Sequence, residues 1–492
     1  MRKHPHLYEI NALAFINRLA AKYNQPLTLA TVPDGEWKAL AQLGFDLIWM
    51  MGVWRRSPEA RRLALANAGL RQEFDRILPG WEPKDIGGSP YAIYGYELDP
   101  ALGKPEDLGF LKDKLNSLGM KLILDFVPNH LAMDHPWTIS NPERFVEGRE
   151  ADVEKHPEWF FPAQGSYLAH GRDPYFAAWN DTVQVNFFCE DTRLALLTEL
   201  ARVAEVCDGV RCDMAMLALN GVFEWVWEGI VDEVAAPQTE FWDLAIPEVR
   251  KRHKDFIFMA EVYWGLENKL LQMGFDFTYD KPLYDHLRWD KAAEIMGHVR
   301  QERDRLWNMT HFIENHDEPR AAAILGHERS MAAAIITGTV PGLHFYQDGQ
   351  LEGKMIRIPV QLGREPLEFA DLEIGLFYRR LLKMGNAGVM HLGQWELLQI
   401  IRGWERNESH LNMVAWRWRL GREQVIVAVN YSPSRSQAWL RVGPPSPLQK
   451  SVVFEDVLTG TTYVREPQEL SSKGLYVDLL PYHAHMMHTT SY

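Results

Sequence analysis

Three carboxyl side chains follow short apolar segments whose pattern predicts strands. They are Asp213, Glu261 and Asp317. Burying a charge at the end of an apolar strand costs free energy unless the charge has a partner or a function. Carboxyls that converge on one cavity raise each other's pKa, so one can stay protonated while another stays ionised. Such a pair is the equipment for glycoside hydrolysis, and in the retaining route the two groups lie about 5–5.5 Å apart.

Polar residues beside these carboxyls fit the same chemistry. Arg211 stands two residues before Asp213, so both side chains leave the strand on one side and can share a hydrogen bond. His130 and His316 are suited to donate hydrogen bonds to sugar hydroxyls. Each motif alone also fits a structural interpretation as a turn, a cap or an ion pair. Their joint occurrence on the third, fourth, fifth and seventh predicted strands favours the catalytic interpretation.

Strand and helix patterns alternate along the chain up to about residue 388. Eight strands before that point predict a (β/α)₈ barrel, the α/β class, rather than a doubly wound sheet. The predicted strands are Leu7–Ile10, Phe45–Met51, Lys121–Val127, Gly209–Cys212, Phe256–Ala260, Phe275–Thr278, His311–Ile313 and Leu343–Tyr346. The predicted helices include one carrying Leu108, Leu111, Leu115 and Leu118 on a single face, and Arg193–Val206, Lys281–Leu306, Glu318–Ile336 and Leu367–Lys383.

Four segments are predicted from the changes in pattern. Residues 1–130 form the first part of the barrel, 131–181 a small inserted subdomain over its carboxyl face, 182–388 the second part of the barrel, and 389–492 a C-terminal antiparallel β-sandwich domain. An earlier insertion, Gly52–Ala101, contains a helix that begins at Ser57-Pro58. The β domain has two possible roles, which are support for the barrel or weak carbohydrate binding through its tryptophans.

Composition limits the partners. The formal net charge of −14 repels nucleic acid and anionic membranes, so neither is expected to bind. Three cysteines are too few for a disulfide framework, no segment resembles a signal peptide, and no apolar run is long enough to span a membrane. A cytoplasmic location is therefore expected, and the sequence does not predict the oligomeric state.

Aromatic residues make up 12% of the chain and serve either as core or as a surface that grips ring-shaped ligands. One group falls in the insertions near the predicted strand ends, where stacking on sugars is expected. Its members are Trp54, Trp81, Tyr91, Tyr94, Trp137, Trp159, Phe160, Phe161, Tyr175, Phe176 and Trp179.

These motifs together resemble the α-amylase superfamily, glycoside hydrolase family 13, over the stretch from about Leu7 to Gly388. A further short match precedes the third predicted helix at Gln184–Phe187. The segments similar to the four family signatures are Asp125–His130, Gly209–Asp213, Ala260–Val262 and Asn315–Asp317.

The resemblance implies a role for each group. Asp213 would be the nucleophile that forms a covalent β-glycosyl intermediate, Glu261 the general acid and then base, and Asp317 a ligand of the sugar hydroxyls beside the anomeric carbon. A second set would bind the substrate, consisting of Tyr91, Asp125, His130, Trp179, Arg211, Trp264 and His316. The expected partner is an oligosaccharide or disaccharide.

No cofactor is expected. Asn129 matches a calcium-binding position in many amylases, but Met214-Ala215-Met216 lacks the polar residues typical after the second signature. Calcium is therefore the less favoured alternative. Tyr91 matches a tyrosine that stacks on the sugar in this family. The family often has an acid directly after that tyrosine, and here the residue is Ala92.

A basic loop follows the eighth predicted strand. Lys354 and Arg357, with Arg364 beyond them, are unusual beside an active site in an acidic protein. One interpretation is surface pairing with Glu352. The other is a phosphate- or carboxylate-bearing substrate, or phosphate as the acceptor.

The predicted function is a retaining α-glycoside hydrolase or transglycosidase acting on α-linked glucose oligosaccharides. Water and sugar acceptors compete for the same intermediate, and the sequence does not decide between them. The alternatives are a phosphorylase or isomerising disaccharide synthase of the same family, and a non-catalytic carbohydrate-binding homologue. The presence of all three acids argues against the last.

Overall fold

Eight parallel strands close into a barrel in the computed structural model, which describes residues 2–231, 236–446, 449–490 and 492. Around the barrel the strands follow the order β1-β15-β14-β13-β12-β11-β5-β2. The predicted (β/α)₈ barrel is therefore confirmed. Its strands are β1 (His6–Asn11), β2 (Leu47–Met51), β5 (Lys121–Phe126), β11 (Gly209–Cys212), β12 (Ile257–Ala260), β13 (Phe277–Tyr279), β14 (Met309–His311) and β15 (Leu343–Gln347).

Barrel strands are buried on both faces, which explains why their sequences are continuous apolar runs. The inward side chains pack on one another, among them Leu47, Trp49, Met259 and Phe345. The outward ones pack against the surrounding helices. These include α1 (Ala12–Tyr23), α2 (Asp34–Leu43), α5 (Asp107–Ser117), α8 (Glu190–Val206), α10 (Phe241–Arg252), α15 (His327–Thr337) and α16 (Leu372–Gly385).

Two segments that were each predicted to form one helix form two helices in the structure. The segment Lys281–Leu306 forms α12 (Lys281–Trp289) and α13 (Ala292–Gln301), with an extended backbone at the junction. The segment Glu318–Ile336 forms α14 (Ala321–Leu325) and α15, because Gly326 between them has φ 77° and ψ 177°. A glycine adopts such angles at no steric cost, and no helix continues through them.

The seventh strand was predicted two residues too late. It spans Met309–His311, and its ladder partners on β13 and β15 end there. Phe312–Pro319 then form a loop over the barrel mouth. This loop is fixed at its far end because the Glu314 carboxylate accepts hydrogen bonds from Arg320 and from the amide of Ala321. Asp317 therefore lies in a loop and not at a strand end.

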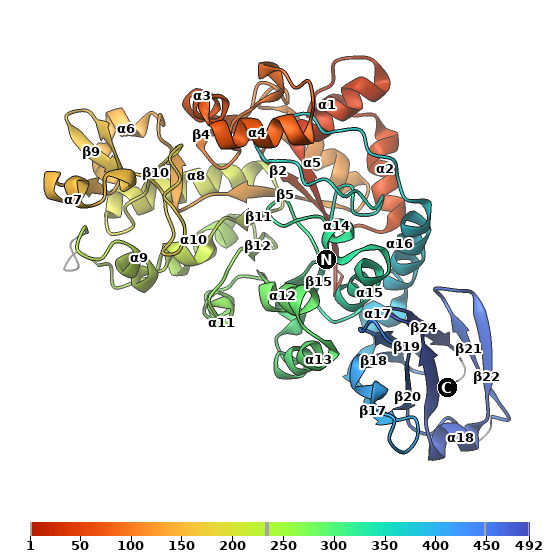
Figure 1. Ribbon diagram of the computed structural model, residues 1–492. Coiled ribbons are helices and arrows are strands. Elements are labelled where there is room, and N and C mark those ends of the chain that lie inside the picture. Colours follow the sequence, from red (N-terminus) through yellow and green to blue (C-terminus); the bar gives the residue numbers. More distant parts are fainter. Residues whose placement is uncertain (1, 232–235, 447–448, 491) are drawn as a thin grey trace.

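Small sheets lie beyond the carboxyl end of β5. β6 (His130–Ala132) pairs with β10 (Thr182–Gln184). The chain between these two strands forms a second small sheet, in the order β7 (Glu147–Gly148), β9 (Ser166–Ala169) and β8 (Phe160–Ala163). In Figure 1 this region projects to one side of the barrel. The earlier insertion pairs β3 (Trp54–Arg56) with β4 (Ile93–Leu98) and carries α3 (Pro58–Ala66) and α4 (Ala68–Ile77).

The C-terminal region is made of two antiparallel sheets. Six strands follow the order β16-β18-β19-β24-β21-β22, and three follow β17-β20-β23. Apolar side chains from both sheets share one core, including Ala415 and Ile426 from one sheet and Leu440 and Val477 from the other. The strands are β16 (Gln394–Leu397), β17 (Gln399–Arg402), β18 (Met413–Leu420), β19 (Glu423–Asn430), β20 (Ser436–Arg441), β21 (Val452–Asp456), β22 (Thr461–Arg465), β23 (Leu475–Leu479) and β24 (Ala484–Thr489).

Two tryptophans of β18 join this domain to the barrel. The indole N–H of Trp416 donates to Thr339 Oγ1 at 3.1 Å, and that of Trp418 donates to the Thr339 carbonyl at 2.7 Å. Both rings are fully buried. Support for the barrel is therefore one role of the domain.

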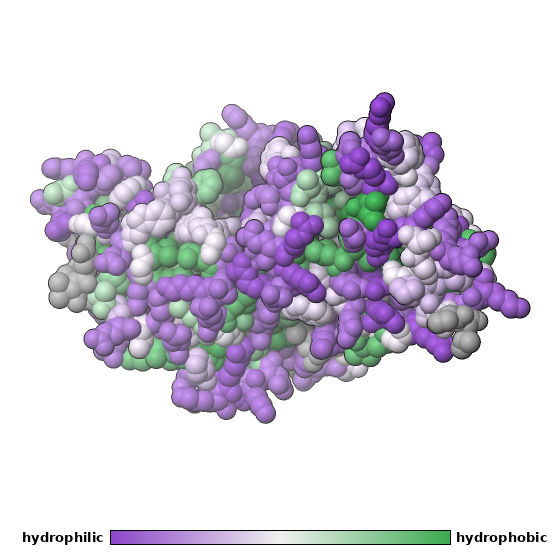
Figure 2. Space-filling model, turned by 90° about the horizontal axis from the view of Figure 1, so that it is seen from below, coloured by the Kyte–Doolittle hydropathy of each residue, from purple (hydrophilic) through white to green (hydrophobic). Residues whose placement is uncertain are grey.

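The surface is mostly polar. Viewed from below, hydrophilic residues cover most of the molecule, with small apolar patches between them (Figure 2). No helix among the described residues is long and apolar enough to cross a membrane.

Buried histidines gather at the amino-terminal end of the barrel. His6 lies 5.2 Å from His344 and 6.3 Å from His391 between ring centroids, and His4 accepts a hydrogen bond from the amide of Gly342. Among the described residues, neither buried ring nitrogen of His6 has a hydrogen-bond partner. Burial lowers the pKa of His4 to about 3 and lowers the pKa values of His6 and His344 well below 6.5. These rings are therefore neutral near pH 7.

This cluster predicts acid sensitivity of folding. Below about pH 6.5 the unfolded chain binds protons at these histidines and the folded chain does not, so stability falls as the pH falls, by up to about 1.4 kcal/mol per pH unit for each ring. His6→Leu should make this fall less steep in denaturant titrations from pH 7 to pH 5. The exposed His483 provides the control, since His483→Leu should leave the slope unchanged. An unaltered slope in His6→Leu would contradict the assignment.

Candidate active site

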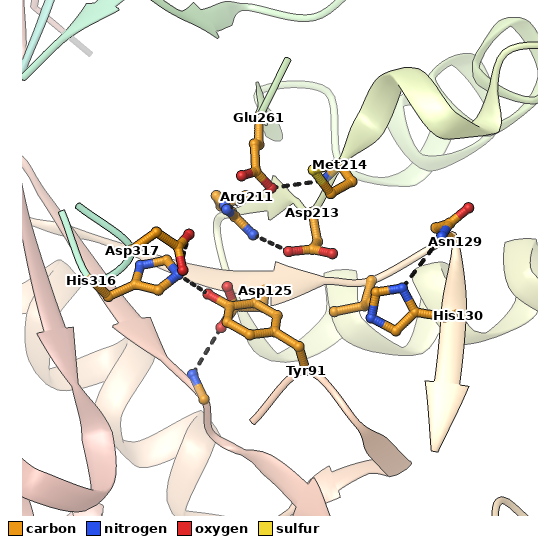
Figure 3. A network of polar contacts seen from close by, with 12 residues as sticks. Tyr91, Asp125, Asn129, His130, Arg211, Asp213, Met214, Glu261, His316 and Asp317 are labelled. Atoms are coloured by element: carbon orange, nitrogen blue, oxygen red, sulfur yellow. Dashed lines mark hydrogen bonds and ion pairs between the residues drawn. The ribbon is translucent and has the colours of Figure 1, made fainter. Parts of the chain in front are cut away.

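One buried guanidinium connects two of the predicted acids (Figure 3). Arg211 Nη1 donates to Asp213 Oδ1 at 2.6 Å, and Arg211 Nη2 lies 2.7 Å from Glu261 Oε2. The two acids follow β11 and β12, which are neighbours in the barrel. Trp49 lies beside the same guanidinium, with its ring centroid 5.2 Å away. The expected pairing of Arg211 with Asp213 is present, and the same arginine also holds Glu261.

Glu261 has a hydrogen-bond donor on each oxygen. Tyr263 Oη donates to Oε1 at 2.7 Å, and the amide of Met214 donates to Oε2 at 2.8 Å. The side chain is almost fully buried. Burial is the main cause that raises the pKa of Glu261 to about 7, with Asp213 contributing in the same direction and Arg211 opposing. At neutral pH this carboxyl therefore exists in both protonation states, which suits an acid that later acts as a base.

Asp213 has a different environment. Burial also raises the pKa of its carboxyl above 3.8, but the charge and hydrogen bond of Arg211 oppose that shift. Arg211 thus opposes the rise in pKa at both carboxyls, and at Asp213 its hydrogen bond adds to that opposition, whereas the pKa of Glu261 reaches about 7. A difference in environment of this kind can suit one carboxyl to the nucleophile role and the other to the acid role.

Asp317 belongs to a chain of contacts that starts inside the barrel. His316 Nδ1 donates to Glu9 Oε1 at 2.5 Å, and its Nε2 lies 3.1 Å from Asp317 Oδ2 and 2.8 Å from Tyr91 Oη. Burial disfavours the imidazolium, but Asp317 and Glu9 outweigh it and raise the pKa of His316 well above 6.5. The cation in turn outweighs desolvation and lowers the pKa of Asp317 to about 2.

This arrangement leaves Asp317 available to a ligand. Its side chain is 54% exposed, and it is ionised at neutral pH. Tyr91 stacks on His316 with ring centroids 5.4 Å apart and an interplanar angle of 22°. An aromatic face and an exposed carboxylate therefore lie side by side at the mouth of the barrel.

Asp125 is the last polar group of β5 and is fully enclosed. Its carboxylate accepts hydrogen bonds from Trp49 Nε1 at 3.1 Å and from the amide of Gly52 at 2.8 Å. Gly52 has φ 76°, and a Cβ there would meet Pro90 at 2.7 Å. Burial raises the pKa of Asp125 to about 6. With both oxygens engaged by the protein, Asp125 acts on the site through the residues it positions.

His130 lies to one side of the acids (Figure 3). Its ring contacts Trp179 at 4.9 Å between centroids, and its Nδ1 lies 3.4 Å from Asn129 Nδ2. Burial lowers the pKa of His130 to about 3, so the ring is neutral. The predicted binding residues thus include a group around Arg211, the pair of His130 and Trp179, and Trp264, whose ring contacts are with Tyr175 and Trp225.

Asn129 is engaged by a neighbouring amide. Gln184 Nε2 donates to Asn129 Oδ1 at 3.0 Å and to its carbonyl at 2.9 Å. Within the described part of the chain, no three His, Cys, Asp or Glu side chains meet in a group that could hold a metal ion. In this arrangement the side-chain oxygen of Asn129 is engaged by Gln184.

Three exposed aromatic rings meet beside the loop that carries Glu261. Trp264 lies 5.4 Å from Tyr175 and 6.0 Å from Trp225 between ring centroids. They come from three segments, namely the loop after β12, the inserted region and α9 (Asn220–Val226). Trp264 also has φ 66°, a left-handed conformation that costs free energy in a non-glycine residue. We call these three rings the aromatic platform.

Some aromatic side chains of the insertions are buried and are not accessible to a ligand. Trp54 was expected to stack on sugars, but it is buried and donates to the Asp125 carbonyl at 2.7 Å. Phe160 is also buried, and Trp159 stacks on Arg172 at 3.7 Å. The sequence pattern could not show that neighbouring chain covers Trp54 and Phe160.

The basic loop is neutralised, but not by the expected partner. Lys354 pairs with Glu365 at 2.5 Å and not with Glu352. Arg357 pairs with Glu73 at 3.1 Å, and Arg364 pairs with Asp85 at 2.8 Å. The partners of Arg357 and Arg364 are distant in sequence, which is why the spacing within the loop did not reveal them.

Sequence reasoning missed two functional groups. Glu9 is an acid in the apolar segment Leu7–Ile10, and the same signal that identified Asp213 could have found it. Tyr263 gave no such signal, because a tyrosine after an apolar strand is also an ordinary core residue.

Comparison with known proteins agrees with this geometry. Residues 37–193 match the family model described as the alpha-amylase catalytic domain. Over that stretch the chain is similar to the alpha-amylase family. The resemblance inferred from the signatures is therefore confirmed.

Several alpha-amylase relatives are similar over about half of the chain. An alpha-amylase of Haloarcula japonica is 29% identical over 281 residues, or 54% of this chain and 37% of that protein. An alpha-1,4-glucan:maltose-1-phosphate maltosyltransferase of Arcanobacterium haemolyticum is 26% identical over 290 residues, or 56% of this chain and 35% of that protein. The matched part is thus little more than a third of each relative.

The fold matches over its whole length. A noncanonic maltogenic alpha-amylase from Thermotoga neapolitana superposes with a TM-score of 0.67, covering 99% of each chain at 19% identity. At that identity the similarity shows the alpha-amylase fold, including the C-terminal sheets, and carries no information on the substrate.

Calcium dependence can be tested by chelation. Treatment with EDTA followed by desalting should leave the melting temperature unchanged, because Asn129 Oδ1 already accepts a hydrogen bond from Gln184. Differential scanning calorimetry with EDTA, with added calcium and with added magnesium measures the effect. A melting temperature that falls with EDTA and recovers only with calcium would show that this alpha-amylase relative has a calcium site.

Proposed function

We propose that the protein is a retaining enzyme acting on α-linked glucose oligosaccharides through a covalent intermediate on Asp213. The observation that carries this proposal is the bridging of Asp213 and Glu261 by one buried arginine. Carboxyls held by a single guanidinium are close together, and a short separation favours direct attack by one of them over attack by an intervening water. Asp317 completes the set, as a ligand of the sugar hydroxyls beside the anomeric carbon.

In the first step Asp213 attacks the anomeric carbon and Glu261 donates its proton to the glycosidic oxygen. The bond from carbon to the leaving oxygen breaks as the bond to Asp213 forms. Arg211 keeps the attacking carboxylate oriented. The pKa of about 7 at Glu261 keeps a large fraction of that group protonated near neutral pH.

In the second step Glu261 is ionised and accepts the proton of an incoming hydroxyl. The oxygen of that hydroxyl attacks the anomeric carbon and releases Asp213. Water gives hydrolysis, and a sugar gives transfer. Two inversions at the same carbon leave the anomeric configuration unchanged.

The aromatic platform suits the acceptor side of this reaction. Trp264 follows Glu261 by three residues, and Glu261 is the group that protonates the leaving sugar and activates the acceptor. Exposed aromatic rings stack on the apolar faces of sugars. We therefore infer that Tyr175, Trp225 and Trp264 hold the leaving or accepting sugar. The names of the relatives include an amylase and a maltosyltransferase, so both outcomes remain part of the proposal.

Phosphorolysis has less support. Lys354, Arg357 and Arg364 each pair with an acid, so none of them offers an uncompensated charge to phosphate. A non-catalytic role has less support still, because Asp213, Glu261 and Asp317 are all in place. A cytoplasmic location is also proposed, in keeping with three free cysteines.

The main test is the product stereochemistry of wild type and Asp213→Asn. Wild type should release products with retained configuration from maltooligosaccharides, and the variant should lose roughly 10³-fold or more in kcat, because an amide is a poor nucleophile. Proton NMR of fresh products measures both. Maltose, isomaltose, trehalose and sucrose, each with and without phosphate, complete the substrate set.

Asp85→Asn provides a matched control, since it changes an acid outside the barrel mouth that pairs with Arg364. Its turnover should stay close to wild type. Net inversion, or undiminished turnover in Asp213→Asn, would exclude the mechanism. A sugar phosphate formed only when phosphate is present would instead support phosphorolysis.

A second prediction concerns Tyr263, which donates a hydrogen bond to Glu261. Removing a donor from a carboxylate raises its pKa. Glu261 must be protonated in the first step, so Tyr263→Phe should move the basic limb of kcat/KM to higher pH by roughly half to one unit. It should also lower kcat, because the carboxyl loses a contact that orients it.

Tyr23→Phe is the matched control. Tyr23 also donates to a carboxylate, Glu36 Oε1 at 2.7 Å, but on the exposed surface of α1. Its pH profile should match that of wild type. If Tyr263→Phe lowers kcat without moving the basic limb, Tyr263 does not act through the pKa of Glu261.

A further inference from the structure

A row of side chains crosses the outer face of the three-stranded sheet in the C-terminal domain. Ile401 on β17, Trp439 on β20 and Tyr476 on β23 stand opposite one another in register. Their neighbours Ala438 and Leu440 point the other way into the domain core. Alternation along the strand therefore directs the row outward, although its residues are apolar or aromatic.

The two aromatic rings are held at an angle to each other. Their centroids lie 5.0 Å apart with an interplanar angle of 56°. The indole N–H of Trp439 donates to the Gly403 carbonyl at 3.1 Å, which fixes the orientation of the ring. Both side chains are only partly buried. They are therefore preorganised and accessible, as an aromatic anchor for a ligand requires.

A groove of about 820 Å³ lies between this row and α18 (Pro467–Ser472). Polar side chains make up much of the opposite wall, among them Glu466, Gln468, Glu469 and Lys473. The volume is in the range of sites that hold a small-molecule ligand. An oligosaccharide segment of a few rings is of this size.

The polar groups of the groove are available to a ligand. Among the described residues, the side chains of Glu466, Gln468 and Glu469 have no hydrogen-bond or ion-pair partner, and Lys473 makes only a contact with the Trp439 ring at 5.6 Å. Two acids, Glu466 and Glu469, are balanced by the bases Arg465 and Lys473. Zero net charge with many donors and acceptors favours a neutral, hydroxyl-rich ligand over an anion or a cation.

We propose that this groove is a second carbohydrate-binding site, which takes an α-1,4-linked glucan chain. Aromatic rings stack on the sugar faces while the polar wall binds the hydroxyls. The elements α18 and β20, which contribute to the lining of the groove, lie in the C-terminal domain, apart from β11 and β12 of the barrel (Figure 1). The choice of glucan rests on the proposed function, whereas the existence of a sugar site rests on the groove alone.

Three tryptophans of this domain fall into two sets. Trp416 and Trp418 are buried against Thr339 and connect the domain to the barrel. Trp439 lies on the outer face of the domain and lines the groove. A supporting role accounts for the first set but not for the second. A glucan site accounts for the second, because a polymer bound there would be kept near the active site.

The test is calorimetric titration of the full chain with maltoheptaose, in an Asp213→Asn background that prevents turnover. The parent should show two classes of site. Trp439→Ala and Tyr476→Ala should each weaken one class by at least about tenfold, because truncating an aromatic anchor commonly costs that much. Trp439→Phe keeps a ring and should lose less. Trp404→Ala changes a 55% exposed tryptophan outside the groove and should bind like the parent.

Outcomes separate this site from the active site. With Asp213 intact, Trp439→Ala should keep wild-type kcat on maltotriose, which is too short to reach both sites. If no glucan is ever cleaved but Trp439→Ala and Tyr476→Ala lose maltoheptaose binding, the proposed function fails and this site stands. Unchanged affinity and stoichiometry in Tyr476→Ala and Trp439→Phe, or no detectable binding by the parent, would overturn it. Melting temperatures identify any variant that fails to fold.

Discussion

A buried arginine between two carboxyls is the interaction on which the site depends. Arg211 is inaccessible to solvent and binds both Asp213 and Glu261. Removing one partner of such a buried group costs roughly 3–5 kcal/mol, because a charge is left without compensation. The arginine therefore fixes the distance between the acids and decides how their charges are shared. It favours an ionised Asp213, while burial raises the pKa of Glu261 to about 7.

Parallel strand register is what puts the arginine there. Arg211 stands directly opposite Asp125 on β5 and Met259 on β12, and Cys212, the last residue of β11, stands opposite Ala260, the last residue of β12. Asp213 and Glu261 then leave the barrel at the same level. The closed barrel also brings Glu9 of β1 within reach of His316, far along the chain, and that contact keeps the histidine charged and Asp317 ionised.

The sequence was sufficient for this part of the structure because an acid that ends an apolar strand is costly to bury and seldom occurs there without a function. The sequence was less informative where a contact involves residues from a distant segment of the chain. Trp54 was expected at the ligand surface and proved to be buried, and Lys354 proved to pair with Glu365. The seventh strand was misplaced because Phe312 and Ile313 are apolar enough for a strand, whereas its pairing with β13 ends at Thr310 and its pairing with β15 ends at His311. The missed Tyr263 acts through one hydroxyl, which spacing alone does not reveal.

The abundance of aromatic residues has three physical causes in this molecule. Rings such as Trp49 and Phe345 fill the barrel interior, and Trp416 and Trp418 use their indole N–H groups to hold two domains together. Some of the accessible rings form two assemblies in which members from separate segments contact one another, the aromatic platform near Glu261 and the pair on the β domain. An aromatic ring left exposed to water does not contribute the stabilising free energy that its burial would provide. The arrangement of these rings beside groups able to hydrogen-bond fits the proposed substrate, a long, neutral chain of sugar rings, and a core or a domain joint alone would not require it.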